Sequence, residues 1–243
     1  ALVPGLHTDF TQMQDGRIAA LTWEVRQVGA RRLLGDRVVL IEADSTIRPL
    51  WSSFDQLPFD ENAYWPAGFY VADPTVEDWS HVNSVSWDAA SDDLVITMTA
   101  YDGIARLDAQ TGVMEWYYGS YEDDFPGDSA LSAAPLSAKV LLNGNLLVFN
   151  RGEFQTDPAG ACSWASELTI DGMEQRSIEV ARWEGDDCTL VTFLGSAQRL
   201  DDESTLVDWT SAGRMERYSA EGDTVWSVAL AAGHAFGTAD WMR

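Results

Sequence analysis

The sequence predicts an all-β protein and, within that class, a β-propeller with four blades in this chain. Two repeated features support this prediction. A polar tight turn followed by an apolar strand occurs four times, and each time a tryptophan-bearing strand follows later in the unit. No stretch of useful length has the periodicity of an amphipathic helix. The chain is therefore expected to consist of similar units of short strands.

The first repeated feature indicates a hairpin in each unit, because turn residues are followed by β-branched and apolar ones. A second strand with an alternating pattern follows each of these segments. The turn-and-strand segments are Asp15–Leu21, Ser91–Thr97, Asn143–Phe149 and Asp202–Val207. The alternating strands are Arg37–Asp44, Gly103–Asp108, Glu167–Asp171 and Arg214–Ser219.

The second repeated feature is a fixed spacing between a glycine and a tryptophan. Trp116 follows Gly112 by four residues, and Trp226 follows Gly222 by four. An aromatic at a fixed point of a four-stranded unit is typical of propeller blades, whose sheets bury both faces against their neighbours. The less regular counterparts are Trp51 and Trp183.

A β-sandwich is the alternative architecture, since its strands also recur between turns, but it gives no reason for the spacing to repeat. We therefore predict a single propeller domain over residues 1–243, or the carboxyl-terminal portion of one. Its blades are expected at approximately 5–54, 79–119, 136–184 and 193–241.

The charge of the chain argues against two classes of partner. The formal net charge is −24, which repels nucleic acids and anionic membrane surfaces. No apolar run approaches the roughly 18 residues of a membrane span. The segment that begins at Ala1 has no charged stretch followed by an apolar signal core, so an export signal has been removed or was never there.

The two cysteines, Cys162 and Cys188, each lie in a polar, loop-like stretch, and we predict that they form a disulfide. Such a bridge would stabilise by roughly 3 kcal/mol in the chain-entropy model and would imply an oxidising compartment. The alternative is two unpaired buried thiols. A metal site is disfavoured because neither a histidine nor a further cysteine lies near either residue.

Several stretches carry a resemblance to a known family. The segment Asp78–Val85, together with Asp88, Asp92–Ile96 and Asp108–Trp116, resembles the central blade of the bacterial arylsulfate sulfotransferases. Shorter stretches are similar in the same order along the chain. These are Leu6–Asp9, Leu142–Asn150 and Gly195–Leu200.

The resemblance implies a six-bladed propeller in the periplasm or outside the cell. It also implies transfer of a sulfuryl group from a phenolic sulfate ester to a phenol, without a nucleotide donor. A channel histidine is transiently sulfated in this family, while other histidines and an arginine hold the sulfate oxygens and exchange the phenolic proton. This chemistry suits a neutral imidazole nucleophile and cationic stabilisers. We expect a small, aromatic ligand and neither a cofactor nor a metal.

Two histidines match the family's motifs. His81 stands in an Asp-Trp-x-His-x-Asn motif, and His7 takes the first place of a His-His-Asp motif whose second histidine is Thr8 here. We therefore name His81 and His7 as catalytic candidates. The ligand-binding candidates are Asn83, Asp9 and Trp79.

Two other positions depart from the family. The place of its arginine is occupied by Thr99–Tyr101, and the place of its sulfated histidine by Ala134–Ala138. A different hydrolase or lyase that uses His81 and Tyr101 as acid and base is therefore an alternative, with Tyr101 as a third catalytic candidate. A non-catalytic propeller subunit is another.

Structural roles for the histidines also stay open. His7 and His81 could be satisfied polar residues of the channel wall. A divalent metal is conceivable if both converge with Asp9 or Asp78, but histidines so far apart in sequence are a weak signal. The remaining histidine, His234, fits a loop position better than a catalytic role.

Four units are fewer than the six that the resemblance implies. An open arc of four blades would expose sheet faces and unpaired edges. We therefore predict a second polypeptide that supplies the first blades, with this chain as the carboxyl-terminal product of a longer precursor. The segment Ala235–Trp241 is expected to pair with that partner. Long loops that cover one mouth of the channel are expected at Asp55–Asp78, Ser120–Pro135 and Gly152–Ala161.

Overall fold

The structure is a computed structural model that describes residues 5–59, 71–119, 124–125, 132–152, 162–185, 188–231 and 234–236. Within these ranges the regular structure is almost entirely β-strand, as predicted. The exceptions are one short helix and one 3-10 turn, α1 (Ser53–Gln56) and η2 (Thr210–Ala212). The chain divides into two compact units, Ala1–Glu122 and Asp123–Arg243.

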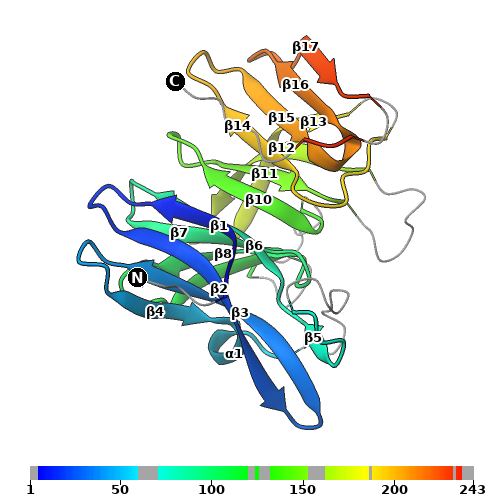
Figure 1. The fold of residues 1–243 in the computed structure, drawn as a ribbon. Helices are drawn as coiled ribbons and strands as arrows, with labels where there is room; N and C mark the ends of the chain where they lie inside the picture. Colours follow the sequence, from blue (N-terminus) through cyan, green and yellow to red (C-terminus); the bar gives the residue numbers. More distant parts are fainter. Residues whose placement is uncertain are drawn as a thin grey trace. The chain divides into compact units, whose positions relative to one another are not determined.

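The first unit contains two antiparallel meanders, which we call blades 1 and 2 (Figure 1). Blade 1 consists of β1 (Leu6–Gln12), β2 (Ile18–Val28), β3 (Arg31–Ile41) and β4 (Ile47–Ser52). A short strand, β5 (Val76–Asp78), pairs with β3 in parallel. Blade 2 consists of β6 (Val82–Asp88), β7 (Asp93–Met98), β8 (Gly103–Asp108) and β9 (Met114–Gly119).

The second unit contains blades 3 and 4, which have the same strand order. Blade 3 consists of β10 (Pro135–Val140), β11 (Leu146–Asn150), β12 (Trp164–Asp171) and β13 (Arg176–Glu184). Blade 4 consists of β14 (Ser196–Arg199), β15 (Thr205–Trp209), β16 (Arg214–Tyr218) and β17 (Thr224–Ala229).

The repeat seen in the sequence corresponds to strands two to four of every blade. Each predicted turn-and-strand segment contains the turn into the second strand, and each alternating segment overlaps the third. The tryptophan strands are the fourth strands, β4, β9, β13 and β17. The first strand of each blade precedes the turn and has no such signature, which is why the sequence pattern showed only three.

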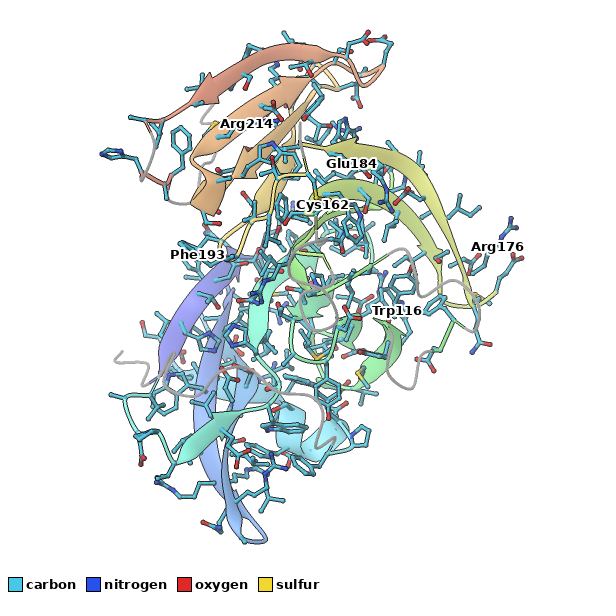
Figure 2. All side chains as sticks on the ribbon, turned by 90° about the vertical axis from the view of Figure 1, so that its right-hand side faces the viewer. Trp116, Cys162, Arg176, Glu184, Phe193 and Arg214 are labelled. Carbon is cyan, nitrogen blue, oxygen red and sulfur yellow. A yellow bond between two sulfur atoms is a disulfide. The ribbon has the colours of Figure 1, made fainter. Side chains whose placement is uncertain are left out.

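Each unit has its own hydrophobic core. In the first unit, Leu33, Val38 and Leu40 of blade 1 belong to the same buried cluster as Val85 and Ile96 of blade 2. In the second unit the buried cluster spans blades 3 and 4 and includes Phe149, Trp183 and Trp209. Figure 2 shows Trp116 among the side chains of blade 2 and Arg176 at the exposed end of the β12–β13 hairpin.

The entrance to the first strand has the same backbone geometry in blades 2 and 3. His81 and Ala134, which immediately precede β6 and β10, have φ angles of 45° and 46°. The carbonyl of His81 accepts a hydrogen bond from the N–H of Thr99, and the carbonyl of Ala134 accepts one from Arg151. A register shift follows in both strands. His81 therefore occupies a left-handed position that the repeat itself creates.

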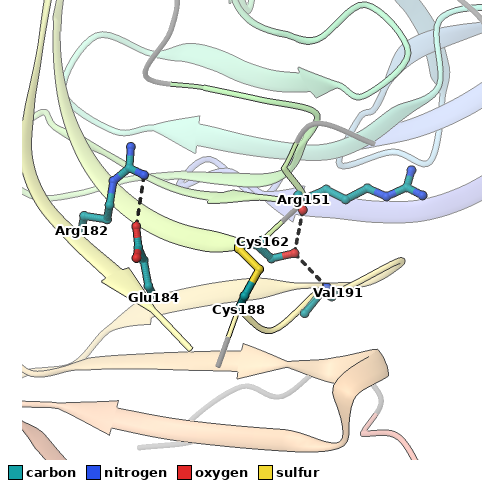
Figure 3. The surroundings of a disulfide bond; sticks show 7 residues. Arg151, Cys162, Arg182, Glu184, Cys188 and Val191 are labelled. Atoms are coloured by element: carbon teal, nitrogen blue, oxygen red, sulfur yellow. Dashed lines mark hydrogen bonds and ion pairs between the residues drawn. A yellow bond between two sulfur atoms is a disulfide. The ribbon is translucent and has the colours of Figure 1, made fainter. Parts of the chain in front are cut away.

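Cys162 and Cys188 form the predicted disulfide, with Cα atoms 4.8 Å apart (Figure 3). Next to it, the hydroxyl of Ser163 donates to the carbonyl of Arg151 and accepts from the N–H of Val191. The bridge thus joins the segment before β12 to the segment after β13. Among the described residues, no helix is long and apolar enough to cross a membrane.

Replacing both Cys162 and Cys188 by serine should lower the free energy of unfolding by about 3 kcal/mol, because the bridge closes a separation of 26 residues. Urea denaturation of the oxidised wild type and the double variant measures the difference. A reductant should destabilise only the wild type. Equal midpoints for the two oxidised proteins would contradict a stabilising bridge.

Candidate functional site

The predicted histidines meet two buried carboxylates in the first unit. His7 lies on β1, Asp36 on β3, Asp78 at the end of β5, and His81 immediately before β6. Three separate parts of the chain, namely β1, β3 and the connection from β5 to β6, therefore supply the four side chains. None of these side chains is more than 5% exposed.

The parallel pairing of β5 with β3 brings the Asp78–His81 segment to Asp36. Asp78 is in register with Leu34, and the N–H of the following residue, Trp79, donates to the Leu34 carbonyl at 3.2 Å. Glycine is required between Leu34 and Asp36. A Cβ atom on Gly35 would lie 2.5 Å from the Phe54 ring and 2.8 Å from Trp79 Nε1.

Asp78 and His81 form the closest pair of the site. His81 Nδ1 lies 2.6 Å from Asp78 Oδ2. Burial raises the pKa of Asp78 and the negative charge of Asp36 adds to the rise, while the hydrogen bond and charge of His81 oppose it. Because a carboxylate at Nδ1 favours a proton on that nitrogen, Nε2 is the atom of His81 that suits proton exchange with a ligand.

Asp36 and His7 form the second pair. His7 Nε2 lies 3.0 Å from Asp36 Oδ1, within ion-pair distance but not aligned as a directional hydrogen bond. His7 Nδ1 lies 2.9 Å from the hydroxyl oxygen of Thr8. Thr8, which replaces the second histidine of the family motif, therefore contacts the ring of the first.

Two of the predicted ligand-binding residues, Asp9 and Asn83, form hydrogen bonds that join neighbouring segments of the first unit. The N–H of Val85 donates to Asp9 Oδ2 at 3.0 Å, which links β1 to β6 and so blade 1 to blade 2. The amide group of Asn83 donates to the hydroxyl of Thr99. Thr99 belongs to the segment Thr99–Tyr101, where the resemblance places the family's arginine. Ligand binding by Asp9 and Asn83 stays a prediction.

Trp79 and Tyr101 lie in the hydrophobic core of the first unit. Their rings meet edge to face with centroids 5.4 Å apart. The Tyr101 hydroxyl donates to the carbonyl of Pro58, and the Tyr117 hydroxyl donates to the carbonyl of Tyr101. Contacts of this kind are typical of packing, and the predicted roles of Trp79 in ligand binding and of Tyr101 in acid–base chemistry stay predictions.

Three other predictions concern His234, the segment expected to pair with a partner, and the long loops. His234 is exposed and lies outside any strand, as expected for a loop residue. Most of the segment predicted to pair with a partner, Ala235–Trp241, lies outside the described residues, as do parts of the three long loops. Of the loop at Asp55–Asp78, the described part includes the end of α1 and all of β5.

One acidic cluster has a spacing that would suit a metal ion. It consists of carboxylates of Asp93, Asp108 and Glu115. The guanidinium of Arg106 lies 2.8 Å from Asp93 and 3.2 Å from Glu115, so a cation already neutralises this cluster. It is best explained as an ion-pair network on blade 2.

The residue that sequence reasoning missed is Asp36. It stands next to Arg37, between the apolar pair Leu33–Leu34 and the apolar run Val38–Leu40, and it is completely buried. A charge inside a buried strand was the available signal, because such groups are rarely buried without partners. Its partners Ser53 and Ser80 were also missed, because nothing in the sequence around either serine distinguishes it from a serine of the surface.

The family model described as arylsulfotransferase (ASST) matches residues 2–143, which is more than half of the chain and includes all four residues of the site. The chain belongs to this family. No curated protein matches the sequence. The family assignment therefore rests on the first unit and the start of the second.

Solved structures that resemble this arylsulfotransferase-family chain are β-propellers. Selenomethionine-substituted virginiamycin B lyase from Staphylococcus aureus matches with a TM-score of 0.53 and 13% identity, over 94% of this chain and 57% of the lyase. A streptogramin B lyase structure matches with a TM-score of 0.52 and 14% identity, over 94% and 56%. These likenesses support the propeller fold alone. The chain spans less than two thirds of the length of either lyase.

Proposed function

We propose that this chain binds a small phenol at the site of the first unit and that His81, oriented by Asp78, is the general base for the phenolic proton in sulfuryl transfer. The observation that carries the proposal is the 2.6 Å contact between His81 Nδ1 and Asp78 Oδ2, two side chains that are both buried. A buried carboxylate at Nδ1 fixes the tautomer and orientation of an imidazole and stabilises the imidazolium that forms.

Proton exchange through one histidine suits a direct transfer. The bond from sulfur to the oxygen of the donor phenol breaks as a bond from sulfur to the acceptor oxygen forms. His81 takes the proton of the acceptor and returns it to the leaving phenolate, so protons balance. A sulfated histidine is not part of this scheme. The segment Ala134–Ala138, where the resemblance places that residue, contains no histidine.

The charges of the site favour a neutral ligand group next to His81. Asp36 and Asp78 are both buried within it, and carboxylates repel a sulfate ester. A phenolic hydroxyl is uncharged and donates a hydrogen bond, which suits an imidazole nitrogen as acceptor. We therefore place the phenol, not the sulfate, beside this ring.

The disulfide supports a periplasmic or secreted location for this function. Disulfides persist in oxidising compartments and are rare in the cytosol.

A hydrolase or lyase that uses His81 and Tyr101 is less well supported. The propellers with similar folds include proteins described as lyases, but identities of 13–14% carry the fold alone. The Tyr101 hydroxyl already donates a hydrogen bond to the Pro58 carbonyl, which makes this hydroxyl a poor proton donor for a ligand.

A non-catalytic subunit is the second candidate function, and the burial of the site's side chains favours it. The side chain of His81 is 2% exposed, so a ligand must displace whatever covers it. In this case the histidines and carboxylates would act only as a polar connection between blades.

Replacing His81 by glutamine should lower turnover of a chromogenic aryl sulfate, supplied with a phenol acceptor, by about 10²-fold to 10⁴-fold, the usual contribution of a general base. Initial rates with and without the acceptor measure it. His234→Gln, at an exposed loop histidine, is the matched control and should leave the rate unchanged. A wild type that transfers no sulfate, or an H81Q variant as active as wild type, would contradict the proposal.

We also propose that further propeller blades on a second polypeptide pack against this chain. Apolar side chains support this: Leu6 and Phe10 on β1 are 54% and 63% exposed, and Val225 and Val228 on β17 are also exposed. Leu6 and Phe10 both belong to the exposed set of the alternating β1 pattern, and exposed apolar residues that share a strand face often mark an interface.

Native mass spectrometry of the assembly should find a second chain, and the double variant Leu6→Ser, Phe10→Ser should weaken its association. Replacement of two solvent-facing residues elsewhere, Leu142→Ser and Met173→Ser, serves as the control. A monomer with no partner, or association that is insensitive to the β1 changes, would contradict this interface.

A further inference from the structure

We infer that Asp36 is a positioning residue for both histidines of the site, through the 3.0 Å contact with the His7 ring and through hydrogen bonds to Ser80 and Val82, the residues on either side of His81. The inference rests on the proposed function of His81. Asp36 itself touches neither reacting atom in that scheme, so its effect is exerted through the two histidines.

One oxygen of Asp36 holds the residues on either side of His81. The hydroxyl of Ser80 donates to Asp36 Oδ2 at 2.5 Å, and the N–H of Val82 donates to the same oxygen at 2.9 Å. Hydrogen bonds to a buried carboxylate are among the stronger ones in proteins. The backbone that carries His81 is therefore fixed on both sides by a single carboxylate from another blade.

The backbone at His81 needs such support. Its φ angle of 45° is left-handed, a conformation that costs a non-glycine residue about 1 kcal/mol or more. The N–H of Thr99 donates to the His81 carbonyl at 3.0 Å and holds the segment from the side of β7. Together with the hydrogen bonds to Asp36 on both neighbours of His81, this contact fixes the backbone from which the imidazole projects.

The other oxygen of Asp36 faces His7. The distance from Oδ1 to His7 Nε2 is 3.0 Å, and Asp36 is completely buried. The backbone N–H of Asp36 is in turn shared between the hydroxyl oxygens of Ser53 and Ser80, each 3.0 Å away. Asp36 is thus anchored on its own strand and fixes the relation of the His7 ring to the His81 segment.

An asparagine at this position would separate these roles. It has almost the same shape but only one acceptor oxygen, so it cannot accept from both Ser80 and Val82 and also face His7 with an acceptor. If the amide oxygen replaces Oδ2, the amide NH₂ group faces His7 Nε2 and favours a lone pair on that nitrogen. The ionisable groups shown to interact with Asp36 are His7, at 3.0 Å, and Asp78, on which the charge of Asp36 acts.

The test is ¹H–¹⁵N correlation NMR of the histidine rings in the full chain, which has three histidines. Asp36→Asn should shift the ring signals of both His7 and His81 and leave His234 unchanged. Ser80→Ala, which removes one donor to Oδ2, should shift His81 more than His7. Asp208→Asn, at a buried aspartate of blade 4, is the matched control and should shift neither.

The same variants separate this inference from the proposed function. If sulfate is transferred, kcat of Asp36→Asn should fall about 10²-fold, the typical cost of a misplaced catalytic group, with a smaller change in KM. If the wild type transfers none, the coupled ring shifts still support positioning while the proposed function fails. His81 signals that are unchanged in both Asp36→Asn and Ser80→Ala would overturn the inference.

Discussion

The first unit depends on one buried charge. Asp36 lies in the middle of β3 with no exposed surface, and a carboxylate in such a place is tolerated only when donors surround it. Its donors come from the segment between blades 1 and 2, at Ser80 and Val82, while the His7 ring meets its other oxygen. The requirement to satisfy one carboxylate thus connects two blades and brings two histidines together.

The propeller repeat determines the backbone geometry at the entrance to a blade, and the side chain at that position determines which chemistry is possible there. Blades 2 and 3 share a left-handed residue before the first strand and the same hydrogen bond to its carbonyl. In blade 2 that residue is His81, but in blade 3 it is Ala134, which has no side chain that can exchange a proton. A family fold is therefore retained while the chemistry of individual blades varies. This is why function must be argued from the site and not from the fold.

Sequence reasoning predicted the parts of the molecule that rest on local patterns. Hairpin turns and tryptophan strands are local, and the motif around His81 is contiguous, so both were found. Asp36 was missed because its partners arrive through the parallel pairing of β5 with β3, which no periodicity reveals. Trp79 and Tyr101 lie in the hydrophobic core, and the sequence could not indicate this because a core aromatic beside a motif looks the same as one that lines a site.

The tautomer of His81 tests the account most directly. Long-range ¹H–¹⁵N NMR of the wild-type chain at neutral pH distinguishes a proton on Nδ1 from one on Nε2, and His81→Gln identifies the signals. The account predicts that His81 carries its proton on Nδ1, held by Asp78, with Nε2 as the nitrogen that exchanges a proton with a phenol. A neutral His81 ring with its proton on Nε2 would contradict it, because Asp78 would then not orient the ring.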